Sequence, residues 1–167
     1  GDRVEHVGTG VEEKPTPRQF GLLAPGAQIG RAPVFPGKPG DRQDLAQRVE
    51  RIVQMVWDDL TPQRILTLAS FKNAINVAMA MGCSTNAIIH LVAMSRRAGE
   101  HCAVGLEDFD AASRKVPVIA NIRPSGSKYL MEDFFYAGGL PGLIEQIRDH
   151  LHLDALTVTG KTLGENV

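Results

Sequence analysis

Cysteine is scarce in this 167-residue chain, which contains only Cys83 and Cys102. Two cysteines this far apart form no disulfide framework and lack the ligand spacing of a zinc site. Aromatic residues make up only 5% of the sequence, which argues against a module that stacks on sugars or nucleobases. Neither sign of charge is in excess, because 18 basic residues face 19 acidic ones. This balance argues against nucleic acid and anionic membranes as partners.

Long apolar runs are also missing. No run approaches the roughly 18 residues that a membrane-spanning helix needs, and the opening GDRVEHVG lacks the apolar core of a signal peptide. We therefore expect a cytoplasmic protein with free thiols and no membrane partner. A chain of this length is of ordinary single-domain size and can bury a substantial core.

Residues 1–40 differ in kind from the rest of the chain. They hold six of the ten prolines together with many glycines, and no apolar period of 2 or 3.6 runs through them. Proline removes backbone donors and glycine raises the entropic cost of ordering. We expect an irregular Pro/Gly-rich segment over 1–40, followed by a folded domain over 41–167.

From residue 41 onward the apolar spacing predicts a series of helices. The first carries its apolar residues from Leu45 to Leu60 and ends at Thr61-Pro62. A second, capped by Thr67 or Ser70, runs to a stop at Gly82. Further helices are expected over 86–98, 106–115, 129–138 and 141–151.

Two short β-branched segments predict strands, VPVIANI at 116–122 and ALTVTG at 155–160. Helices alternating with a few short strands favour an α/β fold in which helix greatly exceeds strand. The second segment continues into TVTGKT, which invites comparison with a phosphate-binding P-loop. The first glycine of that motif is absent, since Ala155 and Leu156 stand there, so we exclude nucleotide hydrolysis by this motif.

The stretch GCSTN interrupts an otherwise apolar region and precedes the helix expected at 86–98. One interpretation is a simple turn in which Ser84 caps the helix. The other is a ligand site, because the free N–H groups of a first helical turn suit an anion. His90 lies one turn after Asn86 on the same helix face, and its plainer interpretation is a core histidine. Cys83 is more simply a packed thiol than a nucleophile.

A second polar loop, RPSGSKY, follows the first expected strand. Its backbone amides and Lys128, with Ser125 nearby, could bind an anion. A solvated turn explains the same residue types. Farther on, Glu132-Asp133 is a carboxylate pair, but adjacent helical residues point about 100° apart, so the two rarely act together.

The sequence also resembles a known family. MGCSTNAIIHLVAMSRRAG is similar to the GGSTN-helix segment of the dehydratases that include dihydroxy-acid, phosphogluconate and sugar-acid (arabinonate, xylonate) dehydratases. The resemblance extends over residues 43–167, through these stretches: RIVQMVWDDLTPQRILT, LEDFDAASRKVPVIANIRPSGSKYLMEDFFYAGGLPGLI and LHLDALTVTGKTLGENV. Within the family, KYLMEDFFYAGGLP is most similar to the sugar-acid branch.

This resemblance implies part of the family's N-terminal α/β domain and a hydro-lyase reaction. Water leaves a 2,3-dihydroxy acid to give a 2-keto acid, with an iron–sulfur cluster and Mg²⁺ as cofactors. A sugar acid is the implied substrate, and dihydroxy-acid dehydratase of branched-chain amino-acid synthesis is the alternative. The resemblance makes six residues candidates for the substrate or cluster side: Ser84, Thr85, Asn86, His90, Ser125 and Lys128.

The sequence departs from the family in its cofactor motifs. It has no Cys followed by Asp-Lys, no Gly-Ala-Cys-Gly-Gly segment and no C-terminal domain with a catalytic serine, and Cys83 replaces a usual glycine. We therefore expect a fragment that binds neither cofactor alone, supplies no metal ligand and is inactive by itself. It is expected to be a homo-oligomer. The alternative is a truncated, non-enzymatic module that self-associates through exposed apolar faces.

Overall fold

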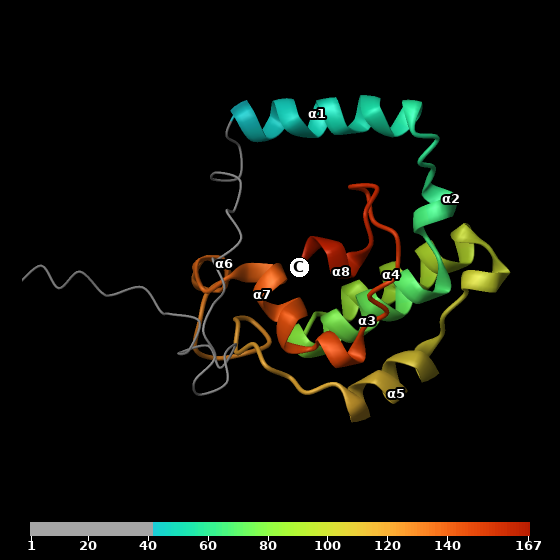
Figure 1. The fold of residues 1–167 in the computed structure, drawn as a ribbon. Helices are drawn as coiled ribbons and strands as arrows, with labels where there is room; N and C mark the ends of the chain where they lie inside the picture. The colour runs from blue at the N-terminus through green and yellow to red at the C-terminus, as the bar shows by residue number, and fades with distance from the viewer. Residues whose placement is uncertain (1–41) are drawn as a thin grey trace, which may run out of the picture.

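The computed structural model describes residues 42–167, with side chains from Ala46 onward. The irregular segment expected over 1–40 lies outside the described residues. The chain is built almost entirely of helices (Figure 1). In order these are α1 (Arg42–Trp57), α2 (Pro62–Ile65), α3 (Leu68–Met81), α4 (Thr85–Ala98), α5 (Leu106–Lys115), α6 (Met131–Tyr136), α7 (Gly139–Gln146) and α8 (Leu163–Asn166). Two 3₁₀ turns add Glu100–Cys102 and Arg148–His150.

Capping residues predicted from the sequence explain both ends of α3. The Thr67 side chain accepts from the Ser70 N–H, and the Ser70 hydroxyl oxygen accepts from the Thr67 N–H, so the two residues act together rather than as alternatives. Gly82 ends α3 with a φ of 66°, a left-handed conformation that glycine adopts without a Cβ clash. The helices expected at 86–98 and 106–115 are confirmed as α4 and α5.

Helix boundaries in the second half of the chain differ from expectation. The helix predicted over 129–138 is only α6, because the Leu130 N–H donates to Asp133 Oδ2 and starts the helix late. The helix predicted over 141–151 begins earlier, at Gly139, and breaks at Ile147 before the 3₁₀ turn.

The prediction of strands at 116–122 and 155–160 is wrong, because neither segment forms a strand. Over the described residues, β-pairing is limited to two isolated bridges, Ile122 with Tyr129 and Leu156 with Thr162. Segment 116–122 is extended, but the N–H groups of Ile119 and Ala120 both donate to the Ala80 carbonyl, at 3.0 and 3.3 Å. The β-branched residues of this segment thus favour an extended backbone. Its N–H groups donate to the end of α3, and not to a neighbouring strand. The helix-rich character of the fold is confirmed.

α3 lies at the centre of the packing, with α4 and α5 against it (Figure 1). One buried cluster joins its end to α6, α7 and the extended segment: Ala80, Val116, Ala120, Ile122, Phe134, Ala137, Leu143 and Ile147. A second joins its start to α5 and the first 3₁₀ turn: Phe71, Ile75, Cys102, Val104, Phe109 and Ala112. No helix in the described part of the chain is both long and apolar enough to cross a membrane.

Buried polar side chains connect distant segments to this core. The Asn73 amide donates to the His152 carbonyl at 2.8 Å and accepts from the His152 N–H at 2.7 Å, which joins the C-terminal segment to α3. The Ser95 hydroxyl accepts from the Val104 N–H at 3.1 Å. The Ser95 bond satisfies a buried N–H group that would otherwise carry a desolvation cost.

Helix α1 stands apart from this body (Figure 1). One face of α1 is apolar yet exposed: Val49, Ile52, Val53, Val56 and Trp57. Arg51 attaches the helix to the C-terminal turn, because its Nε donates to the Val158 carbonyl at 2.7 Å. The amphipathic pattern therefore predicts the helix, although α1 ends at Trp57 and not at Thr61-Pro62. The described chain does not cover the apolar face of α1.

Candidate functional site

Two polar loops predicted from the sequence meet at the end of α3. The Ser125 hydroxyl donates to the Gly82 carbonyl, which joins the 123–129 loop to the turn before α4. A Cβ at Gly82 would lie 3.6 Å from Ser125 Oγ, so the two segments are in direct contact. This junction places Ser125 beside the GCSTN turn, although the two are far apart in the sequence.

The start of α4 presents unengaged polar groups at this junction. Ser84 occupies the N-cap position, as predicted, but its side chain makes no capping hydrogen bond. Ser84, Thr85 and Asn86 are all exposed. The Ala87 N–H donates to the Ser84 carbonyl at 3.0 Å. The N–H groups of Thr85 and Asn86 have no intrahelical acceptor, so the start of this 14-residue helix can bind an anion such as a carboxylate.

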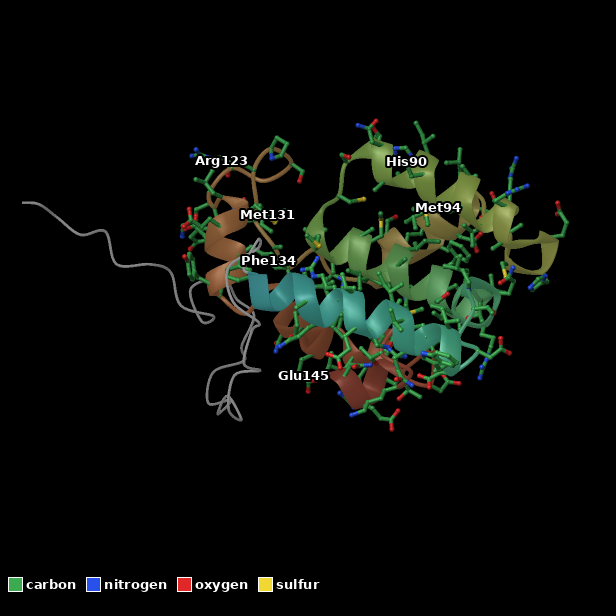
Figure 2. All side chains as sticks on the ribbon, turned by 90° about the horizontal axis from the view of Figure 1, so that it is seen from above. His90, Met94, Arg123, Met131, Phe134 and Glu145 are labelled. Atoms are coloured by element: carbon green, nitrogen blue, oxygen red, sulfur yellow. The ribbon has the colours of Figure 1, made fainter. Side chains whose placement is uncertain are left out.

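His90 is exposed one turn further along α4, so its interpretation as a core histidine is wrong. In Figure 2, His90 on α4 and Arg123 in the polar loop both project from the upper edge of the view. The labelled view therefore places the α4 helix and the 123–129 loop on one side of the molecule.

The 123–129 loop is organised by a residue that the sequence analysis did not single out, Asn121. Its Oδ1 accepts from the N–H groups of Ser127 at 2.7 Å and Lys128 at 3.3 Å. These two amides are therefore engaged and do not form the expected anion cradle. The Lys128 ammonium lies 4.8 Å from the centroid of the Tyr129 ring, a cation–π contact. A lone polar residue within the apolar run VPVIANI was the only signal for Asn121.

The adjacent carboxylates Glu132 and Asp133 have different surroundings, as expected for neighbouring residues of a helix. Asp133 Oδ2 accepts from the Leu130 N–H at 2.8 Å and so starts α6, while Glu132 is exposed. One of the two carboxylates thus has a structural task.

The thiols do not fit an iron–sulfur cluster. Burial raises the pKa of the Cys83 thiol, and its own backbone hydrogen bond offsets this only in part, so the thiol stays protonated at neutral pH. Cys102 is fully buried, and its Sγ donates to the Leu66 carbonyl at 3.2 Å. Within residues 42–167, no three His, Cys, Asp or Glu side chains gather as a metal site. A cluster needs several converging thiolates, and the described residues do not supply them.

Comparison with known proteins identifies related sequences. The family model for the N-terminal domain of dihydroxy-acid/6-phosphogluconate dehydratases matches residues 20–166. An L-arabinonate dehydratase from Rhizobium leguminosarum bv. trifolii is 49% identical over 136 residues, or 80% of this chain and 23% of the relative. A dihydroxy-acid dehydratase from Ignicoccus hospitalis is 49% identical over 151 residues, covering 89% of this chain and 26% of the relative. A dihydroxy-acid dehydratase from Methanosarcina barkeri is 46% identical over 118 residues, covering 71% of this chain and 21% of the relative.

The chain therefore spans about a quarter or less of these relatives. The match to the family model begins at residue 20, inside the segment that composition separates from the domain. The boundary at residue 40 stays a prediction.

Proposed function

Because the chain belongs to the dihydroxy-acid/6-phosphogluconate dehydratase family, we propose that residues 43–167 form part of the substrate-facing domain of a sugar-acid hydro-lyase. The complete enzyme would remove water from a 2,3-dihydroxy sugar acid and form a 2-keto acid. The observation that carries this proposal is the junction of the α4 start with the 123–129 loop, made by Ser125 and Gly82. The choice of a sugar acid is supported by the similarity to an L-arabinonate dehydratase.

In this proposal the start of α4 binds the carboxylate of the acid substrate. Its free N–H groups and the positive end of the helix dipole favour an anion. The exposed side chains of Ser84, Thr85 and Asn86 add hydroxyl and amide groups that can contact substrate hydroxyls. The bond between Ser125 and the Gly82 carbonyl holds the turn in place. His90, on α4, and Lys128, in the 123–129 loop, are further candidates.

In this proposal, other parts of the complete enzyme would hold the iron–sulfur cluster and Mg²⁺. Residues 42–167 hold two cysteines far apart and no group of three His, Cys, Asp or Glu side chains that could hold a metal ion. We therefore derive no step through the family's iron–sulfur cluster or Mg²⁺. Accordingly, we expect the 167-residue chain alone to form no 2-keto acid from L-arabinonate.

A hybrid enzyme tests the proposal. The 136 matched residues of the Rhizobium relative are replaced by those of this chain, and we call the product the hybrid. We expect the hybrid to form 2-keto acid from L-arabinonate at a higher kcat/KM than from a branched 2,3-dihydroxy acid. The relatives named dihydroxy-acid dehydratases support the opposite preference as the alternative function. A hybrid that prefers the branched substrate would establish that alternative.

A second, non-enzymatic candidate rests on the apolar face of α1. Val56 is 75% exposed and Trp57 is 79% exposed, on a helix that the body does not cover. Exposed apolar patches of this kind mark association surfaces. We propose that the isolated chain forms a homo-oligomer through this face, with α1 of one copy packed on another.

We expect light scattering after size-exclusion chromatography to show an oligomer for the unmodified chain and a monomer for Val56→Glu. Trp57, the only tryptophan, should shift its fluorescence to longer wavelength in that variant. Gln47→Glu, an exposed position on the same helix, adds the same charge and serves as the control. Unmodified chain that elutes as a monomer at all concentrations would contradict self-association.

A further inference from the structure

A basic pocket lies along the middle of α3, away from the candidate site at its C-terminal end. It is formed by α3, α5 and the segment at 150–152, and its volume is about 270 Å³. Polar and charged groups from these three elements line it: Lys72, Asn76, Asp108, Lys115, His150 and His152. None of these residues belongs to the junction between α4 and the 123–129 loop.

Positive charge predominates in this pocket, because two lysines and only one carboxylate line it. Over residues 42–167, neither Lys72 nor Lys115 has a carboxylate within ion-pair distance. The one carboxylate in the lining, Asp108, accepts the Gly105 N–H at 2.8 Å through Oδ2 and so helps to start α5. Two ammonium groups and two imidazoles therefore surround a space with a single, partly engaged anion.

The basic groups are carried by a rigid frame. Asn76 Nδ2 donates to the His150 carbonyl at 2.6 Å, and Asn73 bonds both backbone groups of His152. These bonds fix the histidine-bearing segment to the helix that carries Lys72. The buried side chains of Ile75 and Val116 supply apolar wall to the same pocket. A preorganised set of donors lowers the entropic cost of binding.

We propose that this pocket binds a small metabolite through a phosphate group. The lysine ammonium groups and imidazole donors match a compact, multiply charged oxyanion. The volume exceeds that of a single phosphate, and the apolar wall accommodates a short carbon skeleton. This site is separate from the α4 junction, so a test of phosphate binding does not depend on whether the proposed dehydratase function is correct.

The test uses the full 167-residue chain with inorganic phosphate and pyrophosphate as probes. We expect both anions to raise the melting temperature above that in sodium chloride of equal ionic strength, because a ligand bound only to the folded state stabilises it. In two-dimensional NMR spectra, the signals of His150 and His152 should shift on titration with phosphate. These shifts report binding without any enzymatic assay.

Lys72→Gln/Lys115→Gln should weaken phosphate binding about tenfold or more, since two charge-assisted contacts are lost. Arg96→Gln/Arg97→Gln removes the same charge from exposed positions outside the pocket and should leave the affinity unchanged. Both lysines of the pocket are exposed, so circular dichroism should show folded protein for either variant. An equal response to chloride, or equal loss of binding in both double variants, would overturn the site.

Discussion

Gly126→Ala in the hybrid is expected to lower kcat/KM for L-arabinonate by about 100-fold, the cost of displacing substrate-positioning groups by roughly 1 Å. A Cβ at Gly126 would lie 2.5 Å from Asn121 Oδ1 and 2.5 Å from the Ile122 backbone nitrogen. Contacts this short do not occur in folded proteins. The loop must therefore move, because a backbone atom cannot turn aside as a flexible side chain would.

This movement would reach the candidate site through two connections. The Gly126 N–H donates to the Ile122 carbonyl at 2.6 Å, and Asn121 holds the next two amides. Ser125 is adjacent to Gly126 and bonds the Gly82 carbonyl before α4. A displaced loop therefore withdraws Ser125 from the turn that carries Ser84.

Gly142→Ala is the matched control. Its Cβ would meet only the Ala137 carbonyl oxygen, at an ordinary 3.8 Å. Because Gly142 lies inside α7, alanine there should leave kcat/KM unchanged and raise stability by about 0.5–1 kcal/mol. Steady-state kinetics measure kcat/KM, and thermal unfolding measures stability, for the Gly126→Ala and Gly142→Ala hybrids. If Gly126→Ala keeps full activity, the loop does not position the site.

Leu143→Ala is expected to produce the largest loss of stability in the chain, about 3–5 kcal/mol. Leu143 is 0% exposed and belongs to the cluster that joins α7 and α6 to the end of α3. Truncation removes its buried methyl groups and leaves a cavity among close-packed neighbours. A loss of this size is a large share of the 5–15 kcal/mol that stabilises a typical domain.

Leu140→Ala provides the control on the same helix. Leu140 is 45% exposed, so its truncation should cost less than about 1 kcal/mol. Urea unfolding followed by circular dichroism measures both variants against the unmodified chain. Equal free energies of unfolding for Leu143→Ala and the unmodified chain would show that this cluster does not stabilise the fold.

Local signals in the sequence predict most of the helices. Thr67 and Gly82 act on the residues next to them, so their effects can be predicted without the fold. The strands at 116–122 and 155–160 could not be predicted correctly, because β-branched residues favour an extended backbone but do not determine its partner. For the first segment, that partner is the Ala80 carbonyl at the end of α3.

The candidate site was predictable in part. The sequence indicates that the GCSTN turn and the RPSGSKY loop are polar, and the family resemblance implies that residues of both are candidates for the substrate or cluster side. Their direct contact through Ser125 depends on tertiary packing, as does the engagement of loop amides by Asn121. The basic pocket lay beyond sequence reasoning, because Lys72 and His152 are brought together only by the fold.

The central claim is that this chain works as the substrate-facing segment of a sugar-acid dehydratase. The most direct test is the kcat/KM of the hybrid for L-arabinonate, measured on purified protein with its cofactors loaded. We predict a value within about tenfold of the Rhizobium parent, equivalent to less than about 1.4 kcal/mol in transition-state stabilisation. A folded, cofactor-loaded hybrid that forms no 2-keto acid would contradict the claim.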